Sequence, residues 1–153
     1  MNEALTILDA VPACTVINTR IMHAPKDQVF SAWAEPDLLK KWWGPNGFSN
    51  SFHLFDFSEG GRWSFIMHGP DGRNYPNESQ FVKINPPELI VLNHLSNPKF
   101  QVQASFEELP DDRTRLGFTM IFPTEEECNA LRAFVHEKNE ENFNRLEAVL
   151  SGM

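Results

Sequence analysis

Hydrophobic and polar residues alternate along most of this chain, in short runs separated by proline and glycine. Strict alternation is typical of a strand that is buried on one face. Short glycine and proline turns join successive runs, which favours hairpins and therefore antiparallel pairing. Seven such runs occur, at residues 15–23, 49–58, 62–68, 78–85, 88–95, 99–109 and 113–122.

Between the first and second runs, hydrophobic residues recur every three to four positions instead of alternating. Pro25 suits the first position of a helix, and residues 26–34 are predicted to continue it. Pro36 pushes the residue before it out of the helical region, so the helix ends there. A second short helix is predicted over 37–43, stopped by Gly44-Pro45.

The C-terminal segment predicts one long helix that runs to about Leu150. Thr124 and Glu127 form a capping box, in which each side chain satisfies a backbone N–H at the start of a helix. An apolar stripe follows at helical spacing. It comprises Cys128, Leu131, Phe134, Val135, Asn142, Phe143, Leu146, Val149 and Leu150.

These elements predict a single α+β domain over residues 15–151, preceded by a leader at 1–14. A sheet this rich in aromatic residues cannot leave both faces in water, and the long helix is the largest element available to cover one of them. The faces expected to meet the helix carry Trp63, Phe65 and Met67 on one strand, Phe100, Val102, Ala104 and Phe106 on another, and Leu116, Phe118, Met120 and Phe122 on a third.

Composition narrows the set of partners. Thirteen Phe and four Trp stand beside one Tyr, which suits an apolar interior or pocket wall. The net charge is −8 and the 13 Lys and Arg are scattered, so neither nucleic acid nor an anionic membrane surface is an expected partner. The chain shows no signal peptide and no membrane-spanning run, so a cytoplasmic protein is expected, as a monomer or homodimer.

No motif for a cofactor or metal is present in the sequence. Cys14 and Cys128 form neither a CxxC pair nor a disulfide framework, and the five histidines lack the spacing of metal ligands. Nucleotide-binding glycine motifs are absent too, so no cofactor is predicted.

The order of elements and several motifs together resemble a known family. The motifs are VFSAWAEPDLLKKWWGP at 29–45, FDFSEGGRWSFIMHGPDG at 55–72, VKINPPELIVL at 82–92 and NFNRLEAVL at 142–150. As a set they resemble the START-like, or SRPBCC, superfamily with its helix-grip fold. Within it the chain looks like the bacterial proteins named after the activator of heat-shock-protein-90 ATPase.

That resemblance implies a curved seven-stranded antiparallel sheet around the long helix, with a cavity between them for a hydrophobic or amphipathic molecule. The chain departs from the family pattern at Lys138-Asn139, where many relatives have Gly-Trp or Gly-Ala, and a longer side chain there would narrow the pocket mouth. The chain also has no room for the separate N-terminal domain of the chaperone-activating protein, which weakens a chaperone role.

Strand parity and the resemblance together select candidate ligand-binding residues on the inner faces. Each is also suited to ordinary core packing. They are Trp43, His53, Phe55, Trp63, Phe65, Met67, His94, Phe118, Met120 and Phe134.

Three functions remain open at this stage. The first is non-catalytic binding of a lipid-like or aromatic molecule. The second is a cavity enzyme of polyketide cyclase or dehydratase type, with His53, His94 or Asp56 as acid or base. The third is a protein-interaction module that uses an exposed apolar patch, for example around Trp42 or at Leu54 and Ile66. The sequence favours binding over the other two.

Overall fold

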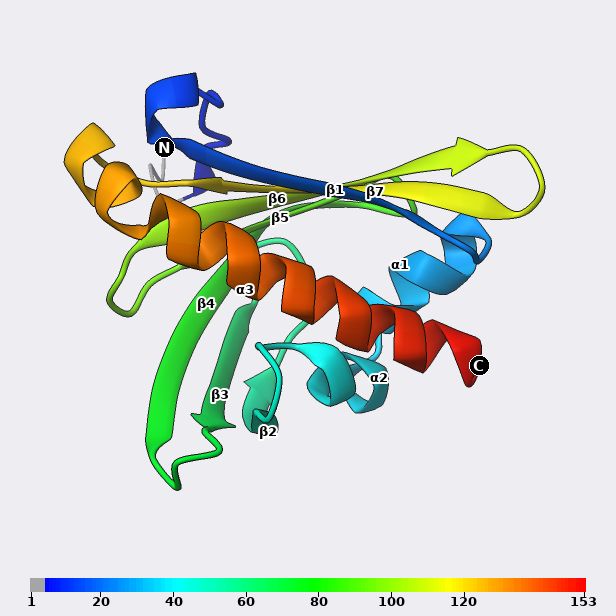
Figure 1. Cartoon of the computed structure of the whole chain (residues 1–153), viewed down its shortest axis with the longest axis horizontal. Coiled ribbons are helices and arrows are strands. Elements are labelled where there is room, and N and C mark those ends of the chain that lie inside the picture. Colours follow the sequence, from blue (N-terminus) through cyan, green and yellow to red (C-terminus); the bar gives the residue numbers. More distant parts are fainter. Residues whose placement is uncertain (1–4) are drawn as a thin grey trace.

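A computed structural model of the protein describes residues 5–153. Seven strands form one antiparallel sheet in the order β1-β7-β6-β5-β4-β3-β2. Figure 1 shows that the sheet curves strongly, with β2, β3 and β4 bending away from the plane of the other strands. The strands are β1 Thr15–Met22, β2 Ser49–Phe55, β3 Arg62–His68, β4 Asn74–Asn85, β5 Leu89–His94, β6 Phe100–Leu109 and β7 Arg113–Ile121.

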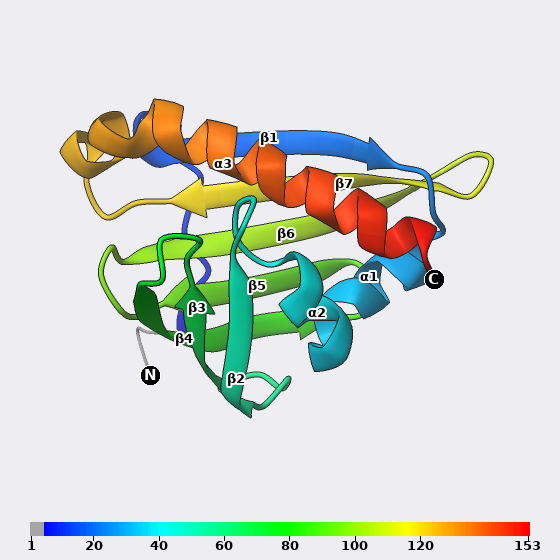
Figure 2. The same cartoon turned by 60° about the horizontal axis from the view of Figure 1, so that its bottom comes forward.

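The helices lie on the concave side of this sheet. The long helix α3, Glu125–Ser151, crosses the concave side, and α1 (Lys26–Ala34) and α2 (Pro36–Trp42) lie near its C-terminal half (Figures 1 and 2). A short 3-10 helix, η2 (Pro12–Cys14), precedes β1. The expected α+β helix-grip arrangement is therefore confirmed, with its two short helices between β1 and β2.

The strand β4 is longer than the sequence predicted. It begins at Asn74 rather than Glu78, because Asn74 to Asn77 continue the antiparallel pairing with β3. Pairing with β5 starts only at Ser79, so this first part of β4 is an edge of the sheet. Proline is tolerated at an edge, which explains how Pro76 fits into the first part of the strand, the part that the pattern did not predict.

Thr124 caps the start of α3 as predicted, but the return bond of a capping box, from the Glu127 side chain to the Thr124 N–H, is not among the hydrogen bonds of the described residues. The Thr124 hydroxyl accepts a hydrogen bond from the Glu127 backbone N–H at 3.1 Å. The buried positions of the helix are Cys128, Asn139, Asn142, Phe143, Leu146 and Leu150. Phe134 was expected in this stripe, and that expectation was wrong, because its side chain is 61% exposed.

The concave faces predicted from strand parity do form the core. One apolar cluster contains Trp63 and Phe65 of β3, Val102, Ala104 and Phe106 of β6, and Leu116, Phe118 and Met120 of β7. The two tryptophans that precede Gly44 differ in burial. Trp42 is fully buried and donates its indole N–H to the Ala32 carbonyl at 2.9 Å, whereas Trp43 is only partly buried.

The N-terminal segment packs on the convex side of the sheet. The Leu8 N–H donates to Gln101 Oε1, and Gln101 Nε2 donates to the Thr6 carbonyl, both at 2.9 Å. Gln103 Nε2 also reaches the Leu8 carbonyl at 2.9 Å. These contacts hold the leader across β6 and bury Gln101 almost completely.

Candidate functional site

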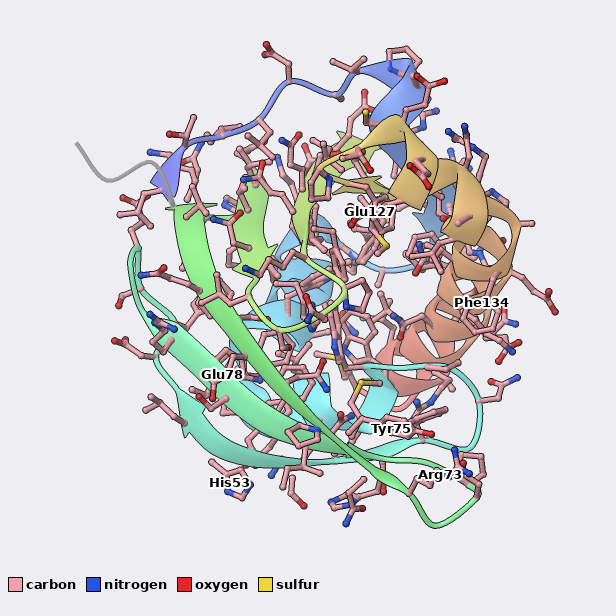
Figure 3. The ribbon with its side chains drawn as sticks, turned by 90° about the vertical axis from the view of Figure 1, so that its left-hand side faces the viewer. His53, Arg73, Tyr75, Glu78, Glu127 and Phe134 are labelled. Atoms are coloured by element: carbon pink, nitrogen blue, oxygen red, sulfur yellow. The ribbon has the colours of Figure 1, made fainter. Side chains whose placement is uncertain are left out.

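A cavity of about 690 Å³ lies between the concave face of the sheet and the middle of α3. Its walls come from β3 to β7, from α3 and from the loop that follows α2. Figure 3 views this end of the molecule, with Phe134 on α3 and Tyr75 near the tip of β4, and both of these aromatic residues line the cavity. Because both side chains are also substantially exposed, they belong to the mouth of the cavity.

Most of the predicted binding residues meet at this cavity. Six of them line it: Trp43, Met67, His94, Phe118, Met120 and Phe134. They come from five parts of the chain, namely the loop after α2, β3, β5, β7 and α3, so the fold brings together residues that are distant in the sequence.

Three other predicted residues pack into the neighbouring aromatic core and do not line the cavity. Trp63 and Phe65 are almost completely buried and stack on each other with ring centroids 4.4 Å apart. Phe55 meets the Trp63 ring edge to face at 5.8 Å. For these three positions the structure favours the packing role over the ligand-contact role.

His53 lies outside the cavity because of a break in strand register. Phe52 pairs with Phe65, but Leu54 pairs with Ser64, so His53 is an extra residue in a β-bulge. The bulge reverses the alternation that would have turned His53 inward, and its side chain is exposed on the outer side of β2 (Figure 3).

Asp56 is likewise exposed. Its carboxylate accepts a hydrogen bond from the Ser58 hydroxyl at 2.7 Å. The Asp56 backbone N–H donates to the Arg62 carbonyl across the turn at 2.9 Å. Its carboxylate is not among the ion pairs of the residues that the structure describes.

His94 is the one predicted acid or base that reaches the cavity wall. Its Nδ1 lies 2.8 Å from the Pro98 carbonyl and its Nε2 lies 2.7 Å from Asn77 Oδ1, while the ring stacks on Phe100 with centroids 4.5 Å apart. Burial lowers the pKa of His94, although the Pro98 carbonyl opposes this by favouring the protonated ring. The imidazole is therefore held in place by the protein on both edges.

Two asparagines of α3 that the sequence analysis did not select as binding residues also line the cavity. Asn139 and Asn142 are both buried, and Asn142 Oδ1 accepts the Gly44 N–H at 3.1 Å. The signal for Asn142 was present in the sequence, because an amide stood at a buried position of an otherwise apolar stripe. Buried amides require hydrogen-bond partners, so such a position points to a network or a ligand.

Lys138 lies on the same stretch of α3, at the cavity wall. Its ammonium group is 3.1 Å from Glu141 Oε2 and lies over the Phe134 ring, 5.5 Å from the centroid. Glu141 also accepts the Asn46 N–H at 3.0 Å, and this bond together with Lys138 lowers the pKa of the carboxyl. The lysine is therefore paired on the protein side instead of carrying an unbalanced charge into the cavity.

Arg145 holds the loop that forms one rim of the cavity. Its guanidinium donates to the carbonyls of Gly44 (2.8 Å), Pro45 (3.0 Å) and Phe48 (2.8 Å), and also to that of Lys41 at 3.0 Å. The loop turns at Gly44, whose φ of +102° strongly disfavours a side chain; a Cβ there would also lie 2.7 Å from Met67 Cε. The loop geometry therefore depends on both residues.

A second hollow, of about 670 Å³, lies between the N-terminal segment and one end of the sheet. It shares His94 and Phe100 with the first cavity but includes no other predicted binding residue. Because the first cavity is enclosed between sheet and helix and gathers six predicted residues, it is the candidate site.

Within residues 5–153, no group of three or more His, Cys, Asp or Glu side chains could hold a metal ion. Cys14 and Cys128 are free thiols. No helix in the same range is long and apolar enough to cross a membrane.

Comparisons with known proteins agree with this architecture. The model of the family described as Activator of Hsp90 ATPase homolog 1-like protein matches residues 23–151. No curated protein sequence matches the chain significantly. Among solved structures, a protein from Arthrobacter aurescens superimposes with a TM-score of 0.86 at 24% identity, covering 98% of this chain and 93% of that one.

Two further solved structures show the same fold. A protein from Nitrosomonas europaea has a TM-score of 0.85 at 21% identity, over 95% of this chain and 97% of the other. The AHSA1 protein from Silicibacter pomeroyi has a TM-score of 0.74 at 18% identity, over 90% and 97%. Since the family model spans most of the sequence and the helix-grip fold agrees with it, the chain belongs to the Activator of Hsp90 ATPase homolog 1-like family.

Proposed function

We propose that this protein binds a hydrophobic or amphipathic small molecule in the cavity between the sheet and α3. The observation that carries the proposal is the cavity itself, whose volume of about 690 Å³ lies within the usual range for small-molecule sites of about 300–1,000 Å³. Its wall combines asparagine side chains with aromatic and thioether groups, among them Trp43, Phe118 and Met120, and these apolar groups favour an apolar ligand body.

The charge distribution supports binding of an uncharged body. Among the described residues that line the cavity, His94 and Lys138 are the basic ones, and none is an aspartate or a glutamate. The lysine is paired with Glu141, and the histidine ring is engaged by Pro98 and Asn77. A ligand that fills the cavity therefore meets a surface whose charges are already compensated.

The alternative of a cavity enzyme has less support from the same residues. His53 and Asp56 are exposed away from the cavity, which leaves His94 as the acid or base within reach. An interaction surface around Trp42 is also disfavoured, because Trp42 is fully buried. At the other predicted surface, Leu54 is half exposed and Ile66 is partly buried, which is less than the large exposed apolar patch that marks an interaction site.

The test is native mass spectrometry of the purified protein, followed by thermal unfolding with fatty acids, flavonoids and sterols. A ligand that binds only the folded state stabilises it, by about 2.7 kcal/mol at a hundredfold excess over Kd. We expect a bound apolar molecule or a clear rise in Tm for one class. A bare protein whose Tm is unchanged by every class would contradict the proposal.

Two variants test whether the ligand-dependent rise in Tm comes from binding in this cavity. Val102→Trp fills the cavity from β6, so it is expected to abolish the ligand-dependent rise in Tm. Ile17→Trp adds the same ring on β1, where the side chain is 57% exposed and outside the cavity, and is expected to retain it. Equal loss in both variants would argue against this cavity as the binding site.

A further inference from the structure

Two amide side chains reach the cavity from successive turns of α3. Asn139 and Asn142 are three residues apart, so they lie on one face of the helix. Their exposed fractions are 8% and 7%, and both line the cavity. An amide presents a donor and an acceptor on opposite sides, so the direction of each group decides what it offers to a ligand.

The direction of Asn142 is set by the backbone of the rim loop. The Gly44 N–H can only donate, so the atom 3.1 Å away must be the amide oxygen of Asn142. The amino group of Asn142 then points the other way. It makes no hydrogen bond with any residue of the part of the chain that the structure describes.

The direction of Asn139 is set by a chain of bonds from β1. Asn18 Nδ2 faces two acceptors, the His136 carbonyl at 3.1 Å and Glu140 Oε2 at 2.7 Å, so its oxygen lies on the opposite side. That oxygen accepts from Asn139 Nδ2 at 3.1 Å. The same amino group lies 3.4 Å from Met120 Sδ, and the Asn139 oxygen has no partner within residues 5–153.

Neither free atom is sealed inside the protein. Among the described residues, the fully buried side-chain nitrogen and oxygen atoms without a partner are Trp33 Nε1, Asn50 Oδ1 and Trp63 Nε1. The Asn142 amino group and the Asn139 oxygen are not among them, so both meet open space, and both residues line the cavity. The cavity wall therefore offers one N–H donor and one carbonyl acceptor from neighbouring positions on one face of α3.

We propose that the ligand carries an uncharged group that both accepts and donates a hydrogen bond, of the carboxamide type, on an apolar body. This inference rests on the proposed function of the cavity. An amide oxygen would accept from Asn142 and an amide N–H would donate to Asn139, which satisfies both atoms. A carboxylate has no donor and places a second acceptor against the Asn139 oxygen, while a hydrocarbon leaves both protein groups unpaired.

The experiment compares three probes of the same shape: para-butylbenzamide, para-butylbenzoate and butylbenzene. Binding is followed by calorimetry and by the intrinsic tryptophan fluorescence of the protein, to which Trp43 at the cavity contributes. Two net hydrogen bonds of about 0.5–1.5 kcal/mol each predict that the amide binds at least about fivefold more tightly than butylbenzene. The benzoate is expected to bind more weakly than the amide.

Asn142→Asp tests the assignment of the donor. The aspartate keeps an oxygen for the Gly44 N–H but replaces the amino group with a second acceptor. At about pH 8, where the carboxylate is ionised, the amide is expected to lose about fivefold or more in affinity, while butylbenzene binding is unchanged. Asn129→Asp makes the same change at an exposed position of α3 outside the cavity, and is expected to leave all affinities unaltered.

The outcomes separate the two proposals. Equal affinities for amide and butylbenzene, or a benzoate that binds as tightly as the amide, would overturn the carboxamide inference while leaving cavity binding intact. These comparisons use the unmodified protein, so they decide the matter even where Asn142→Asp fails to fold. If none of the three probes binds, the carboxamide inference fails, while the proposed function is decided separately by mass spectrometry and by thermal unfolding with fatty acids, flavonoids and sterols.

Discussion

The space between the sheet and the helices has two halves that differ in how they are filled. Next to α1 and α2 it is packed with aromatic rings that are at most 2% exposed, namely Trp33, Trp42, Trp63, Phe81 and Phe106. Next to the middle of α3 it contains the cavity of about 690 Å³. Both halves are lined by the same strands, so the difference arises from the side chains.

Ring size and contact geometry explain the filled half. Trp33 meets Trp42 edge to face at 5.0 Å, and Trp63 stacks on Phe65 at 4.4 Å. Edge-to-face and stacked pairs at these distances fill space and add stability beyond the buried area. In the open half the wall includes Asn74, Asn77, Asn97, Asn139 and Asn142 and the prolines Pro45, Pro70, Pro76 and Pro98, which are too short to reach across.

The strand β6 shows the contrast within a few residues. Phe106 and Ala104 pack in the filled half, while Val102 and Phe100 line the cavity. A packed half supplies stability, and an open half supplies a binding site at the expense of stability. This division makes separate predictions for the two halves.

The largest expected effect is in the filled half. Trp63→Ala removes a ring that is 1% exposed and touches five other rings, so the free energy of unfolding should fall by about 3–5 kcal/mol. Denaturant titration measures it. Trp63→Phe keeps a ring and should cost less than half as much; an alanine variant that loses under about 1 kcal/mol would mean that this half is not the packed one.

The rim loop is the next most sensitive region. Arg145→Met deletes a charged donor shared by several carbonyls and should lower the unfolding free energy by about 2–3 kcal/mol, because hydrogen bonds to charged groups are the strong ones. Probe affinity should fall as the loop loosens. The control is Arg115→Met, which breaks an exposed pair with Glu107 and should change stability by under about 0.5 kcal/mol. Equal effects would show that Arg145 acts only as a surface charge.

A matched pair on β6 tests the contrast directly. Ala104→Phe forces a ring into packed space and should cost about 1–3 kcal/mol, whereas Val102→Phe extends into the cavity and should cost under about 1 kcal/mol. Thermal and denaturant unfolding give the two values. If Val102→Phe is the more damaging change, the cavity is not open space in solution.

The smallest expected effect concerns His94. Its pKa in the folded protein lies below its ordinary value of 6.5, because burial disfavours the charged ring, so the unfolded chain binds the proton more readily. The unfolding free energy should therefore decrease as pH falls below about 6.5 and level off below the folded pKa. In His94→Asn this part of the pH dependence should disappear; an unchanged profile would show that burial does not hold the ring neutral.

Much of this architecture follows from local pattern. Periodicity predicted every strand and helix of the domain, because a half-buried strand must alternate and a covering helix must repeat every three to four residues. Glycine and proline set the turns, and Thr124 set the start of α3, since these residues act through their own backbone geometry or nearest neighbours. The covered face of the sheet also followed, because Phe65 and Met120 share parity with their buried neighbours.

What the pattern missed depended on contacts between distant segments. One bulge residue between Phe52 and Leu54 turned His53 outward, and alternation alone cannot locate a bulge. Whether an inward-facing ring packs in the core or lines a cavity depends on which side chains lie opposite it. Trp63 and Phe118 both face the helix, but Trp63 is packed in the core and Phe118 lines the cavity.

The sequence by itself determined the fold class, the covered face and six of the residues at the cavity, because periodicity and hydrophobicity along the chain, together with the family resemblance of its motifs, select them. Only the tertiary structure decided where the space remains open and which way its amides point. The orientations of Asn139 and Asn142 depend on Asn18 and on the Gly44 N–H, more than 95 residues away in each case. A hydrogen bond across such a distance has no local signature, because it exists only when the sheet has closed around the helix.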